Sequence, residues 1–123
     1  MKILFIGCGS IGRRHITNLR SILKKNVEIL AYRTFLKSHH LEENFFKDYH
    51  VKQFSSLKEA LDQKPDIAFI TNPTSLHIPV ALKAAKAGCH LFIEKPPSHN
   101  LKGINELEFI VKKKKLITFI GFN

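Results

Sequence analysis

A glycine-rich turn close to the N-terminus constrains the fold more than any other feature of the chain. Gly7, Gly9 and Gly12 form the pattern G-x-G-x-x-G, which follows the apolar run 3–6 and precedes a segment with helical periodicity. In this context Gly7 permits a tight turn, Gly9 lets a pyrophosphate approach the backbone, and Gly12 lets the helix pack closely against the strand. The pattern therefore predicts a dinucleotide-binding turn.

Two residues inside this pattern, Ser10 and Ile11, stand at the start of the predicted helix. The first amides of a helix have no partner within the helix, and they point toward negative charge at its N-terminus. We therefore expect Ser10 and Ile11 to take part in binding. The strand, turn and helix context favours this interpretation over a glycine turn with a purely structural role.

Six short apolar runs alternate with segments of helical periodicity along the 123 residues, without an internal repeat or linker. The expected strands are 2–6, 27–32, 51–54, 67–71, 90–94 and 116–122. Because these runs are rich in Ile, Leu, Phe and Val without strict alternation, both of their faces are expected to be buried in a parallel sheet. The prediction is one α/β domain over residues 1–123, a doubly wound Rossmann sheet in the order 3-2-1-4-5-6.

Composition excludes several classes of protein. With 44% hydrophobic residues the chain is too apolar for a disordered tail, and its apolar runs are too short to span a membrane. Cys8 and Cys89 stand far apart and predict reduced thiols, as in a cytoplasmic protein. His39, His40 and His50 match no compact metal-ligand set, so no metal is expected.

The net charge of +10 attracts anions of any kind and does not choose among them. The sharpest basic cluster, 112–115, lies at a predicted helix end, where cations favour the helix dipole. Aromatic residues are not interleaved with it, as a groove for single-stranded nucleic acid would require. A nucleic-acid partner is therefore not expected, and neither is a membrane.

The residues that can carry chemistry follow the ends of the predicted strands. They are 7–12 after the first strand, Arg33 and Thr34 after the second, 71–74 after the fourth, 94–97 after the fifth and 121–123 after the sixth. In a parallel sheet these ends share one edge, and ligands bind outside it where the strand order reverses. The five clusters are therefore expected to form one site.

The end of the second strand bears on the type of dinucleotide. A cofactor with a free ribose 2'-hydroxyl usually meets Asp or Glu there, whereas this chain has Arg33 and Thr34. Arg33 can pair with a 2'-phosphate or stack on adenine, and Thr34 can donate a hydroxyl hydrogen bond. This favours NADP(H) over NAD(H); the alternative is that Arg33 is a solvated surface residue.

Four motifs in order resemble the glucose-fructose oxidoreductase, inositol dehydrogenase and MocA (Gfo/Idh/MocA) family. They are GCGSIGRRH at 7–15, TNPTSLH at 71–77, AGCHLFIEKP at 87–96 and FIGFN at 119–123, and together they span nearly the whole chain. The resemblance implies an NAD(P)-dependent oxidoreductase that transfers a hydride between the nicotinamide and a sugar-like or cyclitol hydroxyl or carbonyl. It also implies a following substrate domain, which often mediates homo-oligomer formation.

That substrate domain would begin where this chain stops, at Asn123. We therefore expect these residues to be a fragment that binds dinucleotide but turns over substrate poorly or not at all. A non-catalytic dinucleotide-binding module or sensor is the alternative function.

The resemblance also assigns roles to single residues. Lys95 would be the catalytic lysine that contacts the substrate hydroxyl and the nicotinamide ribose, and Glu94 would help to fix the cofactor. The residues that would line the cofactor's path are Thr71, Asn72, Pro73 and His77, and Asn123 completes the predicted cofactor-binding set. Chemistry independent of the resemblance agrees for Lys95, since a lysine beside a bound cofactor can position and polarise a hydroxyl oxygen.

Overall fold

The computed structural model describes residues 1–33 and 40–122, in which six strands form one parallel sheet. The strands are β1 (Lys2–Ile6), β2 (Glu28–Tyr32), β3 (Val51–Phe54), β4 (Ile67–Ile70), β5 (His90–Ile93) and β6 (Thr118–Ile120). Their order is β3-β2-β1-β4-β5-β6, and every pair is parallel. The predicted sheet and its strand order are confirmed, and the reversal of order lies between β1 and β4.

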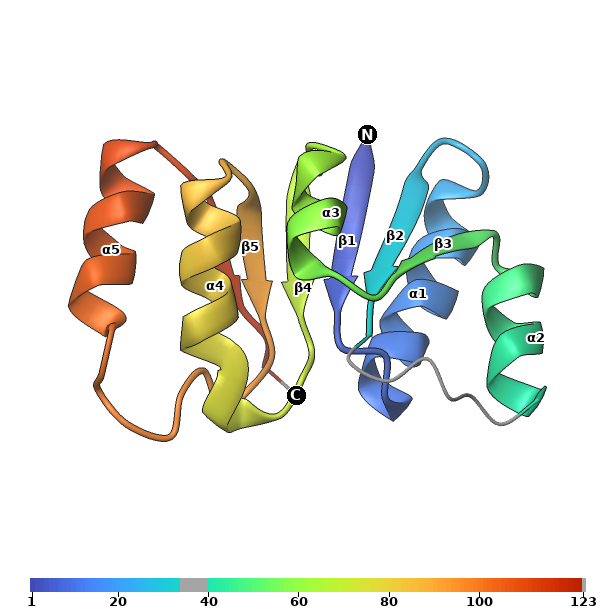
Figure 1. Ribbon diagram of the computed structural model, residues 1–123, viewed down its shortest axis with the longest axis horizontal. Coiled ribbons are helices and arrows are strands. Elements are labelled where there is room, and N and C mark those ends of the chain that lie inside the picture. Colours follow the sequence, from blue (N-terminus) through green and yellow to red (C-terminus); the bar gives the residue numbers. More distant parts are fainter. Residues whose placement is uncertain (34–39, 123) are drawn as a thin grey trace.

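Helices cover both faces of the sheet (Figure 1). They are α1 (Ser10–Leu23), α2 (His40–Asp48), α3 (Leu57–Asp62), α4 (His77–Lys86) and α5 (Ile104–Lys113), and a 3-10 turn, η1 (Thr74–Leu76), precedes α4. The core shared by α3, α4 and α5 lies on one face, and the core shared by α1 and α2 lies on the other. The fold is therefore doubly wound, as the alternation of apolar runs and helical segments predicts.

Strand β1 divides the core into two layers. Leu4 and Ile6 pack against the face that carries α3, α4 and α5, whereas Ile3 and Phe5 pack against α1 and α2, and all four are buried. Burial of a side chain of this size contributes about 1.5–3 kcal/mol relative to leaving it exposed. Residues 3–6 of β1 are therefore buried on both faces of the sheet, and the glycine turn follows directly from the end of this buried strand.

The spacing of the apolar residues 101, 104, 107 and 111 predicts a helix that includes Leu101, and this prediction is wrong by one turn. Leu101 is 84% exposed and precedes α5, which begins at Ile104. Asn100 accepts a hydrogen bond from the Lys102 amide through its side chain, and Gly103 adopts a left-handed φ of 82°. The Asn100 side chain thus gives the Lys102 amide a hydrogen-bond partner outside a helix, and the left-handed Gly103 interrupts helical backbone geometry. Together they keep the segment before Ile104 in a turn.

Both cysteines are buried thiols rather than halves of a disulfide, as predicted. The Cys89 thiol donates a hydrogen bond to the Pro65 carbonyl, and burial raises its pKa to about 11. No helix in the described part of the chain is long and apolar enough to cross a membrane. Within residues 1–33 and 40–122, no three His, Cys, Asp or Glu side chains gather as metal ligands.

Candidate functional site

All six strands of the sheet end at the same level. The residues paired across this level are Phe54 (β3), Tyr32 (β2), Ile6 (β1), Ile70 (β4), Ile93 (β5) and Ile120 (β6). The next residue after a strand donates its amide to the last carbonyl of a neighbouring strand, at 2.8–3.2 Å for Gly7, Thr71, Glu94 and Gly121. The following loops therefore leave the sheet along one edge, as predicted from the sequence.

The glycine turn packs tightly against the end of β4. Gly7 has a φ of 98°, and a Cβ there would lie 2.5 Å from the Asn72 nitrogen. A Cβ on Gly12 would lie 2.5 Å from the Gly7 carbonyl oxygen, which also accepts a hydrogen bond from the Thr71 hydroxyl. Neither position has room for a Cβ, because backbone and side-chain atoms of the turn itself and of the segment after β4 already occupy that space. This explains why both residues are glycine.

Gly9 differs from the other two glycines of the turn. A Cβ on Gly9 would meet no heavy atom within 4 Å, so its outer side is open. Gly9 is the N-cap of α1, no side-chain hydrogen bond caps this helix end, and the first amide to bond back to Gly9 is that of Arg13. The open side of Gly9 and the helix start together fit an anionic group, which is the arrangement of a dinucleotide pyrophosphate site.

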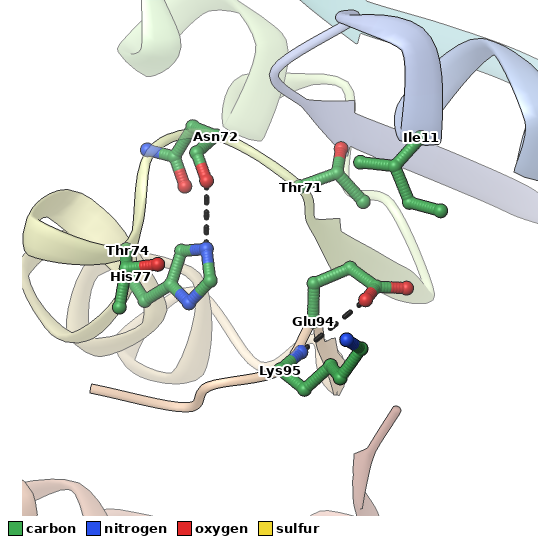
Figure 2. Close-up of a pocket in the computed structure, with 7 residues that line it drawn as sticks. All are labelled: Ile11, Thr71, Asn72, Thr74, His77, Glu94 and Lys95. Atoms are coloured by element: carbon green, nitrogen blue, oxygen red, sulfur yellow. Dashed lines mark hydrogen bonds between the residues drawn. The ribbon is translucent and has the colours of Figure 1, made fainter. Parts of the chain in front are cut away.

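A cavity of about 330 Å³ opens beside this turn (Figure 2). Its lining residues come from the segments after β1, β4 and β5, and they are Ile11, Thr71, Asn72, Thr74, His77, Glu94 and Lys95. Six of these seven are predicted site residues that stand far apart in the sequence. Thr74 is the seventh, and it belongs to the predicted cluster 71–74 without having been given a role of its own.

His77 holds two of these segments together. Its ring is 2% exposed, with Nε2 2.7 Å from the Asn72 carbonyl oxygen and Nδ1 3.1 Å from the Pro96 carbonyl oxygen. His77 therefore lines the cavity as predicted, but both of its ring nitrogens are directed at the backbone of neighbouring segments. Its contribution is to fix the distance between the Asn72 segment and the Lys95 turn.

Asn72 carries an unsatisfied group at the cavity. Its Oδ1 atom is buried and has no hydrogen-bond partner among the described residues. A buried polar atom without a partner costs about 1–3 kcal/mol. This oxygen therefore fits a ligand that brings a hydrogen-bond donor, such as an amide or a hydroxyl.

The Glu94 carboxylate is held from two sides, whereas Lys95 is exposed. Glu94 Oε1 lies 2.6 Å from His15 Nε2, and Glu94 Oε2 accepts the Lys95 backbone amide at 3.2 Å. Lys95 lines the open side of the cavity. The lysine is thus presented to the space where a ligand would lie, on a turn whose backbone is fixed. Sequence reasoning found Glu94 and Lys95 but gave His15 no role.

Two further predicted residues, Arg33 and Pro73, are not among the residues that line the cavity. Arg33 follows β2, and its guanidinium lies over the Phe46 ring at 4.8 Å, with Nη1 3.4 Å from Gln53 Oε1. Pro73 is exposed and does not line the cavity. The predicted residues Thr34 and Asn123 lie outside the described part of the chain.

A parallel sheet with its order reversal at the glycine turn, and a cavity beside that turn, define a dinucleotide-binding Rossmann domain. Residues 1–122 match the model of an oxidoreductase family with an NAD-binding Rossmann fold. The chain therefore belongs to the Gfo/Idh/MocA oxidoreductase family, whose NAD-binding domain it is.

Similar proteins are dehydrogenases. The myo-inositol 2-dehydrogenase of Thermotoga maritima is 32% identical over 124 aligned positions, which cover 100% of this chain and 36% of that protein. The glucose-6-phosphate 3-dehydrogenase of Bacillus subtilis is 28% identical over 99% of this chain and 33% of its own length. The chain thus spans about a third of these relatives.

Solved structures share the fold. A probable dehydrogenase from Thermotoga maritima superimposes with a TM-score of 0.83 at 27% identity, over 98% of this chain and 36% of that one. The WlbA dehydrogenase of Bordetella pertussis, in complex with NADH and UDP-GlcNAcA, gives a TM-score of 0.83 at 22% identity, over 98% of this chain and 35% of its own.

The glycine turn yields a prediction about stability. Gly12→Ala should lower the free energy of unfolding by at least about 1 kcal/mol, because the new Cβ meets a backbone oxygen that cannot rotate away. This net loss already includes the opposing gain of about 1 kcal/mol from the higher helix propensity of Ala over Gly. Gly9→Ala is the matched control, and its loss should stay below about 1 kcal/mol because the space is open. Urea unfolding followed by circular dichroism measures both. Equal stability of the Gly12→Ala variant and the wild type would contradict the close approach.

Proposed function

We propose that this domain holds the nicotinamide dinucleotide of an oxidoreductase that moves a hydride to or from a sugar-like or cyclitol substrate. The observation that carries the proposal is the common edge, where an open glycine turn, the unsatisfied Asn72 oxygen and the exposed Lys95 surround one cavity. The relatives named above, which act on inositol and on a sugar phosphate, support the class of substrate.

Three features of the chain fit the cofactor. The open side of Gly9 leaves room for a pyrophosphate, and the amides of Ser10 and Ile11 at the start of α1 offer it hydrogen bonds. The cavity beyond Ile11 would hold the nicotinamide end, with Thr71, Asn72 and Glu94 among its lining residues. Asn72 Oδ1 would accept a hydrogen bond from a donor of the cofactor, which would remove the cost of its burial.

Lys95 is the proposed catalytic residue. When bound, the nicotinamide supplies the hydride acceptor or donor. The Lys95 side chain, on the exposed side of the cavity, would orient the substrate hydroxyl and accept the proton that it loses on oxidation, or return that proton on reduction. The hydrogen bond between Glu94 Oε2 and the Lys95 amide would hold the Lys95 backbone in position relative to the carboxyl ends of the strands.

Arg33 supports a preference for NADP(H) over NAD(H). It lies at the end of β2, where its guanidinium is held by the Phe46 ring and Gln53. A 2'-phosphate would meet this positive group. The contribution of a Thr34 hydroxyl remains a prediction from the sequence, since Thr34 lies outside the described residues. The preference rests on this placement.

The whole enzyme is proposed to contain a second, substrate-binding domain, because the relatives are about three times as long as this chain. We propose that it works as a homo-oligomer in the cytoplasm on a polyol or sugar-like small molecule. In that enzyme this domain would bind the cofactor and would contribute Lys95 and one wall of the active site.

Dinucleotide binding is the first test. The chain should bind NADPH or NADH in a fluorescence titration, and Gly9→Ala should weaken binding by about tenfold or more, since its methyl group takes the space of the pyrophosphate. Leu101→Ala is the control because Leu101 is exposed and is not among the residues that line the cavity. Undiminished binding by the Gly9→Ala variant would refute the placement of the pyrophosphate.

The cofactor preference is the second test. NADPH should bind more tightly than NADH, and Arg33→Asp should reverse the order, because a carboxylate repels the 2'-phosphate and accepts from a free 2'-hydroxyl. Competition titrations with both nucleotides measure the two ratios. The same ratio before and after the substitution would remove Arg33 from recognition.

Lys95→Ala tests the chemistry. In the enzyme that pairs this domain with a substrate domain, kcat should fall by at least about a hundredfold, as for loss of a general acid-base group. Cofactor affinity should stay within about threefold, because the glycine turn is untouched. A variant that turns over sugar or cyclitol substrates as fast as the wild type would remove Lys95 from the mechanism, whereas a wild-type enzyme that binds dinucleotide without turning over any such substrate would favour the alternative of a binding module without chemistry.

A further inference from the structure

His15 contacts the Lys95 turn from the glycine-turn helix, although the two are far apart in the sequence. It lies on α1 three residues after Gly12, so the two residues share one face of the helix. Its Nε2 atom lies 2.6 Å from Glu94 Oε1. A carboxylate only accepts hydrogen bonds, so Nε2 carries the proton and donates it.

The surroundings of His15 favour this one orientation. Its ring packs beside Phe69 and Phe92, with centroid separations of 5.6 and 5.2 Å. The side chains of His15 and Glu94 are only 22% and 13% exposed. A hydrogen bond to a charged acceptor in such a site is short and strong, because little water competes for either partner.

Neighbouring atoms restrict the position of the Glu94 carboxylate. A Cβ on Gly121, which follows β6, would stand 3.2 Å from Glu94 Oε1, so the end of β6 closes one side. Its second oxygen accepts the Lys95 amide at 3.2 Å. One carboxylate therefore joins α1, through His15, to the backbone of Lys95.

We infer that His15 is a positioning residue, which sets the height of Lys95 relative to the glycine-turn helix through Glu94. The inference rests on the proposed function, since the purpose of the link is to keep the lysine in register with a dinucleotide bound at that helix. Without His15, Glu94 Oε1 loses its donor in a mostly dry site, and the carboxylate turns toward water. The Lys95 amide then loses its acceptor, and the turn loosens.

The first experiment needs neither cofactor nor activity. In the wild-type chain, long-range ¹H–¹⁵N spectra should show His15 protonated at Nε2, and the Lys95 amide resonance should carry the downfield shift of a hydrogen-bonded amide. In the His15→Phe variant, which keeps an aromatic ring between Phe69 and Phe92, the Lys95 amide should move upfield and exchange with solvent about tenfold faster.

Two further variants separate positioning from packing. His15→Gln places an amide donor near the former Nε2 position and should return the Lys95 amide to within about threefold of the wild-type exchange rate. His90→Gln is the matched control, because His90 lies at the other end of β5, where its Nδ1 accepts from the Ile117 amide. It should leave the Lys95 amide unchanged.

Loss of the His15 link should affect kcat much more than KM. In the complete enzyme, His15→Phe should lower kcat about tenfold while the KM for dinucleotide stays within about threefold, and His15→Gln should recover most of kcat. An Nδ1-protonated His15, or a Lys95 amide that is the same in the His15→Phe variant as in the wild type, would overturn the inference. A wild-type chain with the expected His15 and Lys95 signals but no dinucleotide binding would support the link and refute the proposed function instead.

Discussion

The parallel ladder, whose six strands end at the same level, is the constraint on which the site depends. Parallel strands pair with evenly spaced, slanted hydrogen bonds, so the amide that follows each strand still bonds to the neighbouring strand before the chain turns away. Gly7, Thr71, Glu94 and Gly121 all leave the sheet in this way. Loops that start at one level and from rigid strands meet over the same edge, whatever their separation in sequence.

Packing between these loops then fixes their distances. The Thr71 hydroxyl bonds to Gly7, the His77 ring lies between the Asn72 and Pro96 carbonyls, and Glu94 reaches His15. Each contact joins segments that follow two different strands or a strand and a helix. The polar groups that remain at the cavity without such internal partners are therefore the ones that a ligand can address, and the buried Asn72 oxygen is the clearest of them.

Most of the fold could be predicted because its determinants are local. Apolar runs mark the strands, and the glycine turn identifies the first strand, the first helix and the reversal of strand order between β1 and β4. Errors arise where local periodicity continues past a boundary set by turn chemistry, as at Leu101, which precedes the left-handed Gly103. They also arise where a polar residue shares an apolar helix face. His15 fits the periodic pattern of α1, but its partner Glu94 is supplied by another strand and could not be found from spacing.

Net charge explains little of the site, and the structure shows why. Several lysines of this basic chain form exposed ion pairs, which contribute little to stability. These pairs include Lys58 with Asp62, Lys86 with Glu106 and Lys112 with Glu108. In the proposed site the attraction for an anion would come instead from backbone amides at the start of α1, whose direction is fixed by the glycine turn. Side-chain charge in solution is screened within about 10 Å, whereas an amide held by the fold acts at contact distance. Recognition of a phosphate group in this site would therefore depend on the positions of Gly7 and Gly12, which pack the turn against β4, more than on the excess of lysine over the surface.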